Sequence, residues 1–217
     1  MQPTETADGS PTLRSLRYGE LYHAREGGRS QAERLFVGLS GVAEREEARV
    51  LEVGFGVGLN FLATLEAIRK AGGTLYFIGL EPDPVPAEVL AKVFDRCRLV
   101  PEIHGRLLAA WERGRDFVLM GDGFVLKVRF APVERVRLAD NWADVVYYDP
   151  FSPRANPMAW SLANLARARD AMRRGGVLVS YAVAGWVRRN LRSLGFAVER
   201  VRGELGKRSW LRARRIS

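Results

Sequence analysis

Glycines alternate with apolar residues in the segment LEVGFGVGLNF, residues 51–61, in a pattern suited to binding a small molecule. Three glycines occupy alternate positions, and a backbone without side chains can approach a ligand closely. Glu52 stands just before this turn, and the next β-rich run, TLYFIGL, ends at Glu81. A carboxylate at the tip of the second strand of an α/β sheet can accept hydrogen bonds from both hydroxyls of a ribose. The turn and the acid together predict a nucleotide-like ligand.

A third acid, Asp149, follows the apolar run ADVVYY and begins the proline-rich loop DPFSPRANP. Open α/β sheets bind ligands in the crevice outside the carboxyl ends of their strands, so Asp149 should face the same crevice as Glu52 and Glu81. The prolines of this loop stiffen it and limit the entropy that is lost when it becomes ordered. Asp149 is therefore expected to meet a substrate beside the nucleotide-like ligand.

The elements that must position these acids alternate between short β-rich runs and helical stretches from residue 49 onward, which is typical of a parallel sheet. Helices are expected to begin near Leu59, Val85 and Met158. The Gly-Asp-Gly of RDFVLMGDGFVLKVRF predicts a β-hairpin insertion, and the runs FAVERVR and RSWLRAR predict an antiparallel C-terminal strand. We expect an α/β, Rossmann-like fold with a mostly parallel seven-stranded sheet.

Length and composition fit one domain, which we assign to residues 14–217 after a disordered, polar tail over residues 1–13. Apolar runs stay well below the roughly 20 residues of a membrane span, and the start, MQPTETADGSPT, matches no secretory or transit signal. Cys97 is the only cysteine, and the two histidines lie far apart in the sequence, so neither a disulfide nor a metal site is expected. A cytoplasmic location is expected.

The net charge of +9 is unevenly distributed. From Arg154 to Ser217 there are 15 Lys and Arg against three Asp and Glu, whereas the preceding residues carry a slight excess of acids. This asymmetry favours a polyanionic partner, most often nucleic acid, although an ordinary solvated surface gives the same count.

The glycine spacing discriminates between nucleotide ligands. A dinucleotide-binding turn has its third glycine at the sixth position of G-x-G-x-x-G, where this chain has Leu59. The order Glu-x-Gly-x-Gly-x-Gly instead resembles the turn of Rossmann-like class I methyltransferases that use S-adenosylmethionine (SAM), in which the acid before the turn can engage the amino end of methionine. An NAD enzyme and an empty tight turn stay open as alternatives.

Four segments together resemble the methyltransferase domain of the bacterial MnmC family: YGELYHAREGGRSQAERLFVG, LEVGFGVGLNF, YYDPFSPRANPMAW and AGWVRRNLRSLGFAVERVRGELGKRSWL. The resemblance extends over about residues 14–213. It implies SAM-dependent N-methylation of the 5-aminomethyl group of a modified wobble uridine, forming 5-methylaminomethyluridine or its 2-thio form, with the anticodon loop of tRNA as partner. No metal is expected, because methyl transfer needs none, and no flavin is expected, because the flavin-dependent oxidase half of the family does not follow Ser217. The expectation is a stand-alone methyltransferase, with a separate oxidase or the enzymes that install the aminomethyl group as partners.

The resemblance and the position of the acids at the strand tips assign the candidate residues. Asp149 is the catalytic candidate. Cofactor binding is expected from Glu52, Gly54, Phe55, Gly56, Gly58, Asn60, Phe61, Glu81, Pro82, Asp149 and Pro150. Substrate binding is expected from Phe151, Ser152, Arg154, Tyr181, Arg188, Arg189, Lys207 and Arg208. Further candidates are Tyr148 and Trp160 for an aromatic pocket, Tyr22 for closing over it and Arg192 for an RNA contact.

An alkylamine with a pKa of about 10.4 is protonated at neutral pH, and a carboxylate alone favours the charged form. We therefore expect aromatic side chains to lower the pKa of the amine by desolvation, and Asp149 to orient the amine. Two positions depart from the usual pattern of the family: Ala131-Pro132 replaces the Gly-Asp that ends the third core strand, and Asp149-Pro150-Phe151 replaces Asp-Gly-Phe. They leave two alternatives open, a SAM methyltransferase for another small or nucleotide substrate and a tRNA-binding relative without activity.

Overall fold

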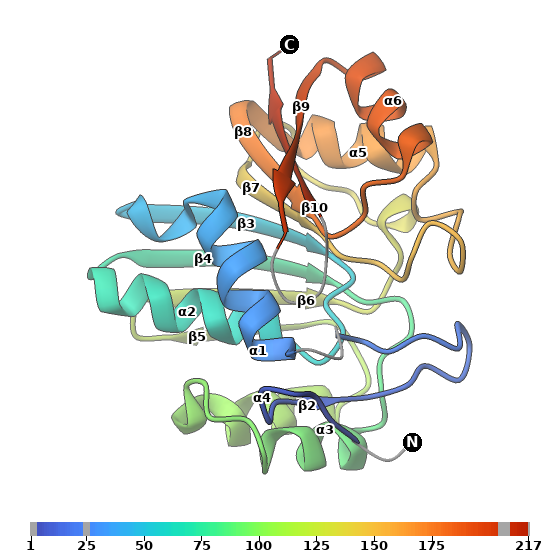
Figure 1. Cartoon of the computed structure of the whole chain (residues 1–217). Helices are drawn as coiled ribbons and strands as arrows, with labels where there is room; N and C mark the ends of the chain where they lie inside the picture. Colours follow the sequence, from blue (N-terminus) through green and yellow to red (C-terminus); the bar gives the residue numbers. More distant parts are fainter. Residues whose placement is uncertain (1–3, 24–26, 204–208, 217) are drawn as a thin grey trace.

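One mixed β-sheet forms the centre of the molecule in the computed structural model, which describes residues 4–23, 27–203 and 209–216 (Figure 1). Its strands are β3 (Glu47–Val53), β4 (Thr74–Leu80), β5 (Phe117–Gly121), β6 (Phe124–Arg129), β7 (Ala143–Tyr148), β8 (Met172–Ser180), β9 (Phe196–Arg202) and β10 (Ser209–Arg215). Their order across the sheet is β5-β6-β4-β3-β7-β8-β10-β9. Pairing is parallel from β6 to β8 and antiparallel where β5 meets β6 and where β10 meets β8 and β9.

The predicted α/β sheet, its hairpin and its antiparallel C-terminal strand are confirmed, but the sheet has eight strands rather than seven. The hairpin joins β5 to β6 with Gly121 opposite Phe124. Because β6 also pairs with β4, the hairpin is not an appendage: it supplies both a core strand and the edge strand β5.

Helices cover both faces of the sheet, because successive side chains of a strand point to opposite sides. In β7, Val145 and Tyr147 belong to one buried cluster, which includes residues of α2, α3 and α4, whereas Val146 and Tyr148 belong to a second cluster with residues of α5 and α6. The helices are α1 (Gly28–Gln31), which continues as a π-helix (Ala32–Gly38), α2 (Leu59–Ala71), α3 (Ala87–Phe94), α4 (His104–Trp111), α5 (Leu162–Ala171) and α6 (Gly185–Ser193). Short 3-10 turns occur at Val42–Glu44, Pro101–Ile103 and Val133–Arg135.

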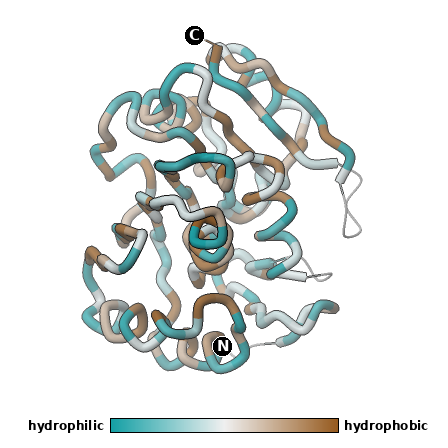
Figure 2. The backbone as a smooth tube through the Cα atoms, turned by 90° about the vertical axis from the view of Figure 1, so that its left-hand side faces the viewer, coloured by the Kyte–Doolittle hydropathy of each residue, from teal (hydrophilic) through white to brown (hydrophobic). Residues whose placement is uncertain are grey.

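Hydrophobic stretches along the chain are short and separated by hydrophilic ones (Figure 2). Among the described residues, no helix combines the length and the apolar character that crossing a lipid bilayer requires.

The N-terminal segment is ordered where the sequence predicted a disordered tail. Its first described residues form a small antiparallel hairpin, β1 (Thr4–Glu5) and β2 (Pro11–Thr12), and Leu13 is fully buried in the core. The side chain of Ser10 explains this order, because its Oγ accepts hydrogen bonds from the backbone N–H groups of Gly28 (2.8 Å) and Arg29 (3.0 Å) at the start of α1. These hydrogen bonds join residues that are far apart in the chain, so the polar composition of the segment does not predict them. Residues 1–3 lie outside the described residues.

Candidate active site

A cavity of about 600 Å³ opens at the carboxyl ends of β3, β4 and β7, between the glycine turn and the loop that follows β7. Its wall contains most of the predicted site residues: Gly54, Phe55, Gly56, Asn60, Glu81, Pro82, Asp149, Pro150, Phe151, Ser152, Tyr181 and Tyr22. Residues that come from distant parts of the sequence therefore share one crevice, as the parallel sheet predicts.

The glycine turn is pressed against the loop after β7. Gly54 has φ +91°, and a Cβ atom at this position would lie 2.6 Å from the carbonyl oxygen of Asp149. Gly56 has φ +58°, and its missing side chain leaves room for the ring of Tyr22. Both the backbone conformation and the close approach require glycine, so the turn forms a surface of exposed backbone beside the cavity.

Glu81 is buried at the end of β4, where its carboxylate accepts two backbone hydrogen bonds. Oε2 accepts from the N–H of Gly56 at 2.7 Å, and Oε1 accepts from the N–H of Asp83 at 2.8 Å. Burial raises the pKa of Glu81 to about 7, although both hydrogen bonds oppose this shift. Each oxygen keeps a second lone pair, so the carboxylate can still accept hydrogen bonds from a ligand.

The raised pKa of Glu81 predicts a pH-dependent difference in stability between the wild type and Glu81→Gln. An acid with a raised pKa in the folded state stabilises the protein fully below its unfolded pKa of about 4.5, and this contribution is lost as the pH rises through about 7. Half-buried His23, whose pKa is lowered to about 4 by desolvation, acts in the opposite sense, so the two proteins must be compared at each pH. We expect the melting temperature of the wild type to fall relative to Glu81→Gln between pH 4.5 and 7.

Differential scanning fluorimetry of the ligand-free proteins measures this difference. Glu112→Gln, at an exposed position of the surface, is the matched control. The difference between its melting temperature and that of the wild type should stay constant with pH. A constant offset between the wild type and Glu81→Gln across this pH range would show that Glu81 titrates normally.

Glu52 lies behind the cavity rather than in its wall, and its contact with the cofactor stays a prediction. Its side chain is completely buried, and Asn60 separates it from Asp149: the Nδ2 of Asn60 donates to Glu52 Oε1 at 2.6 Å and to Asp149 Oδ2 at 3.0 Å. Burial and then the negative charge of Asp149 raise the pKa of Glu52 well above its ordinary value. Glu52 therefore positions Asn60, which in turn holds Asp149 at the wall.

Two other predicted cofactor residues, Phe61 and Gly58, also lie outside the cavity wall. Phe61 is fully buried and packs edge-on against Phe77, so it does not reach the cavity, and Gly58 lies outside the cavity wall. Phe55 belongs to the wall, but only 3% of its surface is exposed, because its ring stacks on Trp111 with a centroid separation of 6.1 Å. Sequence spacing placed these residues near the turn correctly, but it could not decide which of them faces inward.

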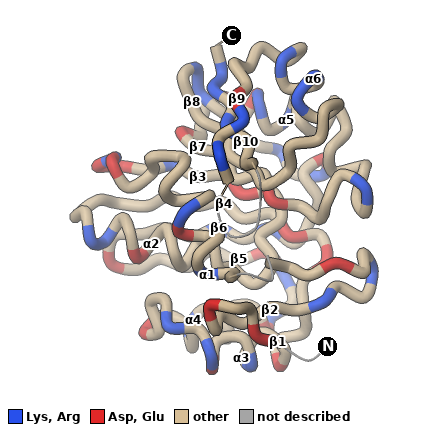
Figure 3. Tube along the Cα trace, in the orientation of Figure 1, with Lys and Arg blue, Asp and Glu red and all other residues tan. Residues whose placement is uncertain are grey.

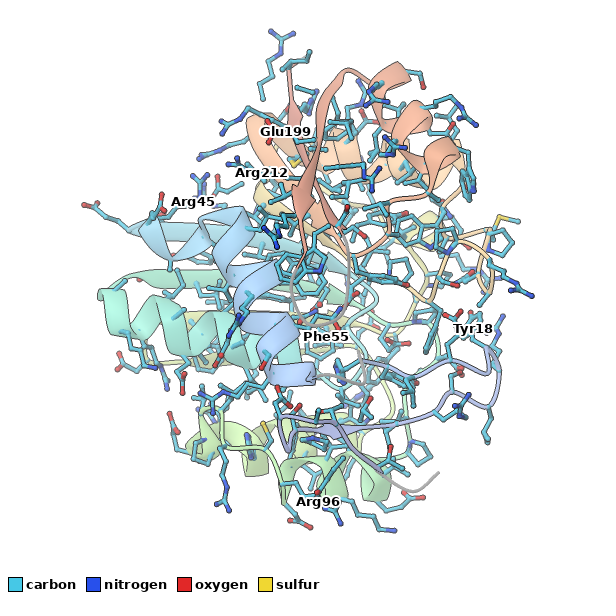
Figure 4. The ribbon with its side chains drawn as sticks, in the orientation of Figure 1. Tyr18, Arg45, Phe55, Arg96, Glu199 and Arg212 are labelled. Carbon is cyan, nitrogen blue, oxygen red and sulfur yellow. The ribbon has the colours of Figure 1, made fainter. Side chains whose placement is uncertain are left out.

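Phe151 belongs to an aromatic group that closes one side of the cavity. Its ring stacks on Tyr18 (centroids 4.5 Å apart) and meets Tyr22 edge-on (5.1 Å, 84°). Glu20 lies between these tyrosines in the sequence, and its carboxylate accepts hydrogen bonds from Ser152 N at 2.9 Å and Ser152 Oγ at 2.6 Å. The N-terminal segment at Tyr18 thereby joins the loop after β7, on the right-hand side of Figure 4.

Tyr18 and Glu20 were not predicted as site residues. No local pattern identifies them, because Tyr18 lies in a turn and Glu20 in a bend, and Gly19 between them has φ +68°.

Two of the aromatic residues proposed for the pocket, Tyr148 and Trp160, instead pack in the core and hold the loop that follows β7. Tyr148 and Trp160 are almost completely buried and pack edge-on with centroids 5.0 Å apart. Trp160 Nε1 donates to the carbonyl oxygen of Phe151 at 2.8 Å, and the hydroxyl of Tyr148 donates to the carbonyl oxygen of Ala159. Both side chains therefore lie in the core and outside the cavity wall.

Tyr181 does line the cavity, and its hydroxyl donates to the carbonyl oxygen of Pro150 at 2.7 Å. Desolvation and then the negative charge of Asp149 raise the pKa of Tyr181 well above its ordinary value, so the group remains a neutral donor. The loop after β7 is thus held from three sides, by Tyr181, by Trp160 and by Glu20.

Pro132 and Glu134 also line the cavity, just beyond the end of β6. This is the region where Ala131-Pro132 departs from the usual pattern of the resembled family. Glu134 Oε2 accepts a hydrogen bond from Asn164 Nδ2 at 3.2 Å, so an acid is still present two residues after the proline.

The predicted basic residues that the structure describes lie outside the cavity wall. Arg154 and Arg189 are exposed, and the Nε of Arg188 donates to the carbonyl oxygen of Val183 at 3.2 Å. Lys207 and Arg208 lie outside the described residues. Figure 3 shows that basic residues are frequent on the part of the molecule formed by α5, α6 and β8 to β10, whereas acids gather near the tips of β3 and β4.

Within the ranges that the structure describes, no three His, Cys, Asp or Glu side chains are grouped so that they could hold a metal ion.

Known proteins share both the sequence and the fold. The chain is 36% identical, over 95% of its length, to the tRNA 5-methylaminomethyl-2-thiouridine biosynthesis bifunctional protein MnmC of Cupriavidus necator. A protein of the same name from Aromatoleum aromaticum is also 36% identical, over 96% of this chain. The chain spans about a third of the length of these relatives, 33% and 34% respectively. The crystal structure of MNMC2 from Aquifex aeolicus matches with a TM-score of 0.78 and 28% identity, covering all of this chain and 70% of that one.

The sequence model of a family described as S-adenosyl-L-methionine-dependent methyltransferase matches residues 98–216, which is more than half of the chain. This match confirms the class of enzyme that the glycine turn predicted. The chain belongs to the S-adenosyl-L-methionine-dependent methyltransferase family.

Proposed function

We propose that this protein transfers a methyl group from SAM to the 5-aminomethyl group of a modified wobble uridine in tRNA. The observation that carries the proposal is the position of Asp149, which Asn60 holds at 3.0 Å in the same cavity wall as the glycine turn and Glu81. The relatives in Cupriavidus and Aromatoleum, whose names concern 5-methylaminomethyl-2-thiouridine in tRNA, support this choice of acceptor.

The residues at the strand tips fit SAM. Glu81 offers two carboxylate oxygens to the ribose hydroxyls, and the turn through Gly54 and Gly56 leaves the backbone open where side chains would fill the space. When bound, SAM supplies an electrophilic methyl group on a sulfonium. We assign Pro82, Asn60 and Pro150 to the same cofactor wall.

On the acceptor side, Asp149 accepts hydrogen bonds from the amine and orients its lone pair. Deprotonating an alkylamine of pKa about 10.4 costs on the order of 4 to 5 kcal/mol at pH 7. Desolvation beside Phe151, Tyr22 and Tyr181 lowers this cost, because an apolar wall disfavours the charged amine. Ser152, fixed by Glu20, holds the loop in place while the amine is aligned, and alignment at near-attack distance is a major source of rate.

Binding of tRNA needs cations that replace the counterions of the phosphates. We assign this role to Arg154, Arg188, Arg189 and Arg192, together with Lys207 and Arg208 outside the described residues. A single-stranded anticodon loop makes it less costly to move the modified base into the cavity than extraction from a duplex. The proposed setting is the cytoplasm, where the enzymes that install the aminomethyl group, or a separate oxidase, would supply the substrate.

An in vitro assay with methyl-labelled SAM tests the function. We expect label to enter tRNA that carries 5-aminomethyluridine at the wobble position and to appear as 5-methylaminomethyluridine in nucleoside mass spectrometry. The matched control is the same tRNA transcript without the modification, which should stay unlabelled. SAM binding without transfer to the aminomethyl tRNA would disprove the proposed acceptor, and transfer to the unmodified transcript would identify a different one.

A further inference from the structure

Helix α6 presents one continuous face of unusual composition to solvent. Val187 and Leu191 point into the core, whereas Trp186, Arg189 and Arg192 are exposed. Positions three and six residues apart lie on adjoining parts of a helix surface, so the indole and the two guanidinium groups form one row. We call these three residues the α6 face.

The exposed tryptophan is not explained by packing. Trp186 is 36% exposed, whereas Trp111, Trp160 and Trp210 are each at most 5% exposed and belong to the core clusters. Helix α6 contains three arginines and no acid. Among the residues that the structure describes, none of these arginines forms an ion pair within 4.0 Å.

The α6 face lies close to the cavity. Trp186 follows the cavity residue Tyr181 by five residues, so its Cα is at most about 18 Å from that of Tyr181. The first turn of α6 and the loop between β7 and α5 lie on the same side of the sheet (Figure 1). Two apolar side chains of that loop region, Met158 at the cavity wall and Leu162, are 66% and 48% exposed.

An exposed aromatic ring beside unpaired cations suits a single-stranded nucleic acid. Bases stack on aromatic side chains with little dependence on sequence, and arginines contact the backbone phosphates. We propose that the α6 face binds the single-stranded RNA that flanks the acceptor nucleotide, with Trp186 stacking on a neighbouring base and Arg189 and Arg192 contacting phosphates. This inference rests on the proposed function and goes beyond it, because it assigns a binding site for nucleotides that are not modified.

Binding of an anticodon stem-loop RNA, measured by fluorescence anisotropy without SAM, tests the inference on the full chain. We expect Trp186→Ala to weaken binding roughly 5- to 150-fold, which corresponds to the loss of one stacked base. Trp186→Phe should stay within about threefold of the wild type, because phenylalanine keeps an aromatic face for stacking. Met120→Ala removes a side chain that is 64% exposed on β5, at the far edge of the sheet, and should leave binding unchanged.

The salt dependence of RNA binding distinguishes base stacking on Trp186 from phosphate contacts by the arginines. Arg189→Ala should reduce the slope of log K against log salt concentration by about one, whereas Trp186→Ala should lower affinity at every salt concentration without changing the slope. In turnover with modified tRNA, Trp186→Ala should raise KM and leave kcat near the wild-type value. Equal melting temperatures for the variants show that the fold is intact.

Unchanged RNA binding by Trp186→Ala would overturn the inference, as would an equal loss in Trp186→Phe. A dimer in gel filtration that only Trp186→Ala dissociates would assign the α6 face to a second copy of the chain and would likewise overturn it. The proposed function is tested separately. If the wild type binds the RNA through Trp186 but does not methylate the aminomethyl tRNA, the RNA-binding site is supported and the proposed reaction is wrong.

Discussion

Replacing Asp149 with alanine is expected to lower kcat for methyl transfer by about 10² to 10⁴, the range associated with loss of a group that handles the reacting proton and aligns the acceptor. Asp149 lines the cavity and is held through Asn60, so its removal leaves the amine without an acceptor for its N–H groups. Donor binding should change less than about threefold, because Glu81 and the glycine turn remain in place and no charged contact to the ribose is removed.

Single-turnover rates with labelled SAM and calorimetry with S-adenosylhomocysteine measure the two quantities independently. Asp140→Ala, at an exposed position, serves as the control and should match the wild type in both. Near-normal turnover in Asp149→Ala would exclude this residue from the reaction. Loss of donor binding together with turnover would move its role to the cofactor.

Replacing Glu81 with alanine is expected to weaken donor binding by roughly 5- to 150-fold, or about 1 to 3 kcal/mol, because two ribose hydroxyls lose their acceptor in a buried site. The same change removes the acceptor for the N–H groups of Gly56 and Asp83, so part of the loss reflects a looser turn. Glu81→Gln keeps one oxygen and should fall between the wild type and Glu81→Ala.

Calorimetric titration of S-adenosylhomocysteine into each variant checks this order, with Glu112→Ala as the surface control. At saturating SAM, kcat should recover most of its wild-type value, because Glu81 does not touch the acceptor amine in the proposed arrangement. An unchanged dissociation constant in Glu81→Ala would mean that the ribose binds elsewhere.

Glu81 and Asp149 are linked through the glycine turn although 68 positions separate them in the sequence. Glu81 fixes the turn through the N–H of Gly56, and the turn touches the carbonyl oxygen of Asp149 at Gly54, where a side chain would overlap it. This contact is made by the backbone of Asp149, which alanine retains, so the effects of the two substitutions should be close to additive in the double variant.

Strand and helix positions were predictable from the sequence, because periodicity and turn residues act over short distances. The hairpin at Gly-Asp-Gly, the antiparallel strand at the C-terminus and the convergence of Glu81 and Asp149 at one edge of the sheet are confirmed by the structure. Parallel connectivity alone brings these acids together, since it places the carboxyl ends of the strands on one side.

The sequence did not predict which side chains of the glycine-turn motif are buried and which line the cavity. Glu52 and Phe61 stand in the same motif as Asn60, yet the two former side chains are fully buried and only Asn60 reaches the wall. The reason is that neighbouring residues at the end of a strand or the start of a helix point in different directions, and the packing of the whole core decides which direction leads to the cavity.

By itself, the sequence determined the fold class, the glycine turn and the acids that end two strands, because each of these depends on residues close together in the chain. Only the tertiary structure decided that Glu20 closes the cavity by binding Ser152, 132 positions away, that Glu52 lies behind the wall, and that Trp186 faces solvent. Contacts over such separations depend on how complete elements pack, and a local pattern carries no information about the partner that a side chain meets.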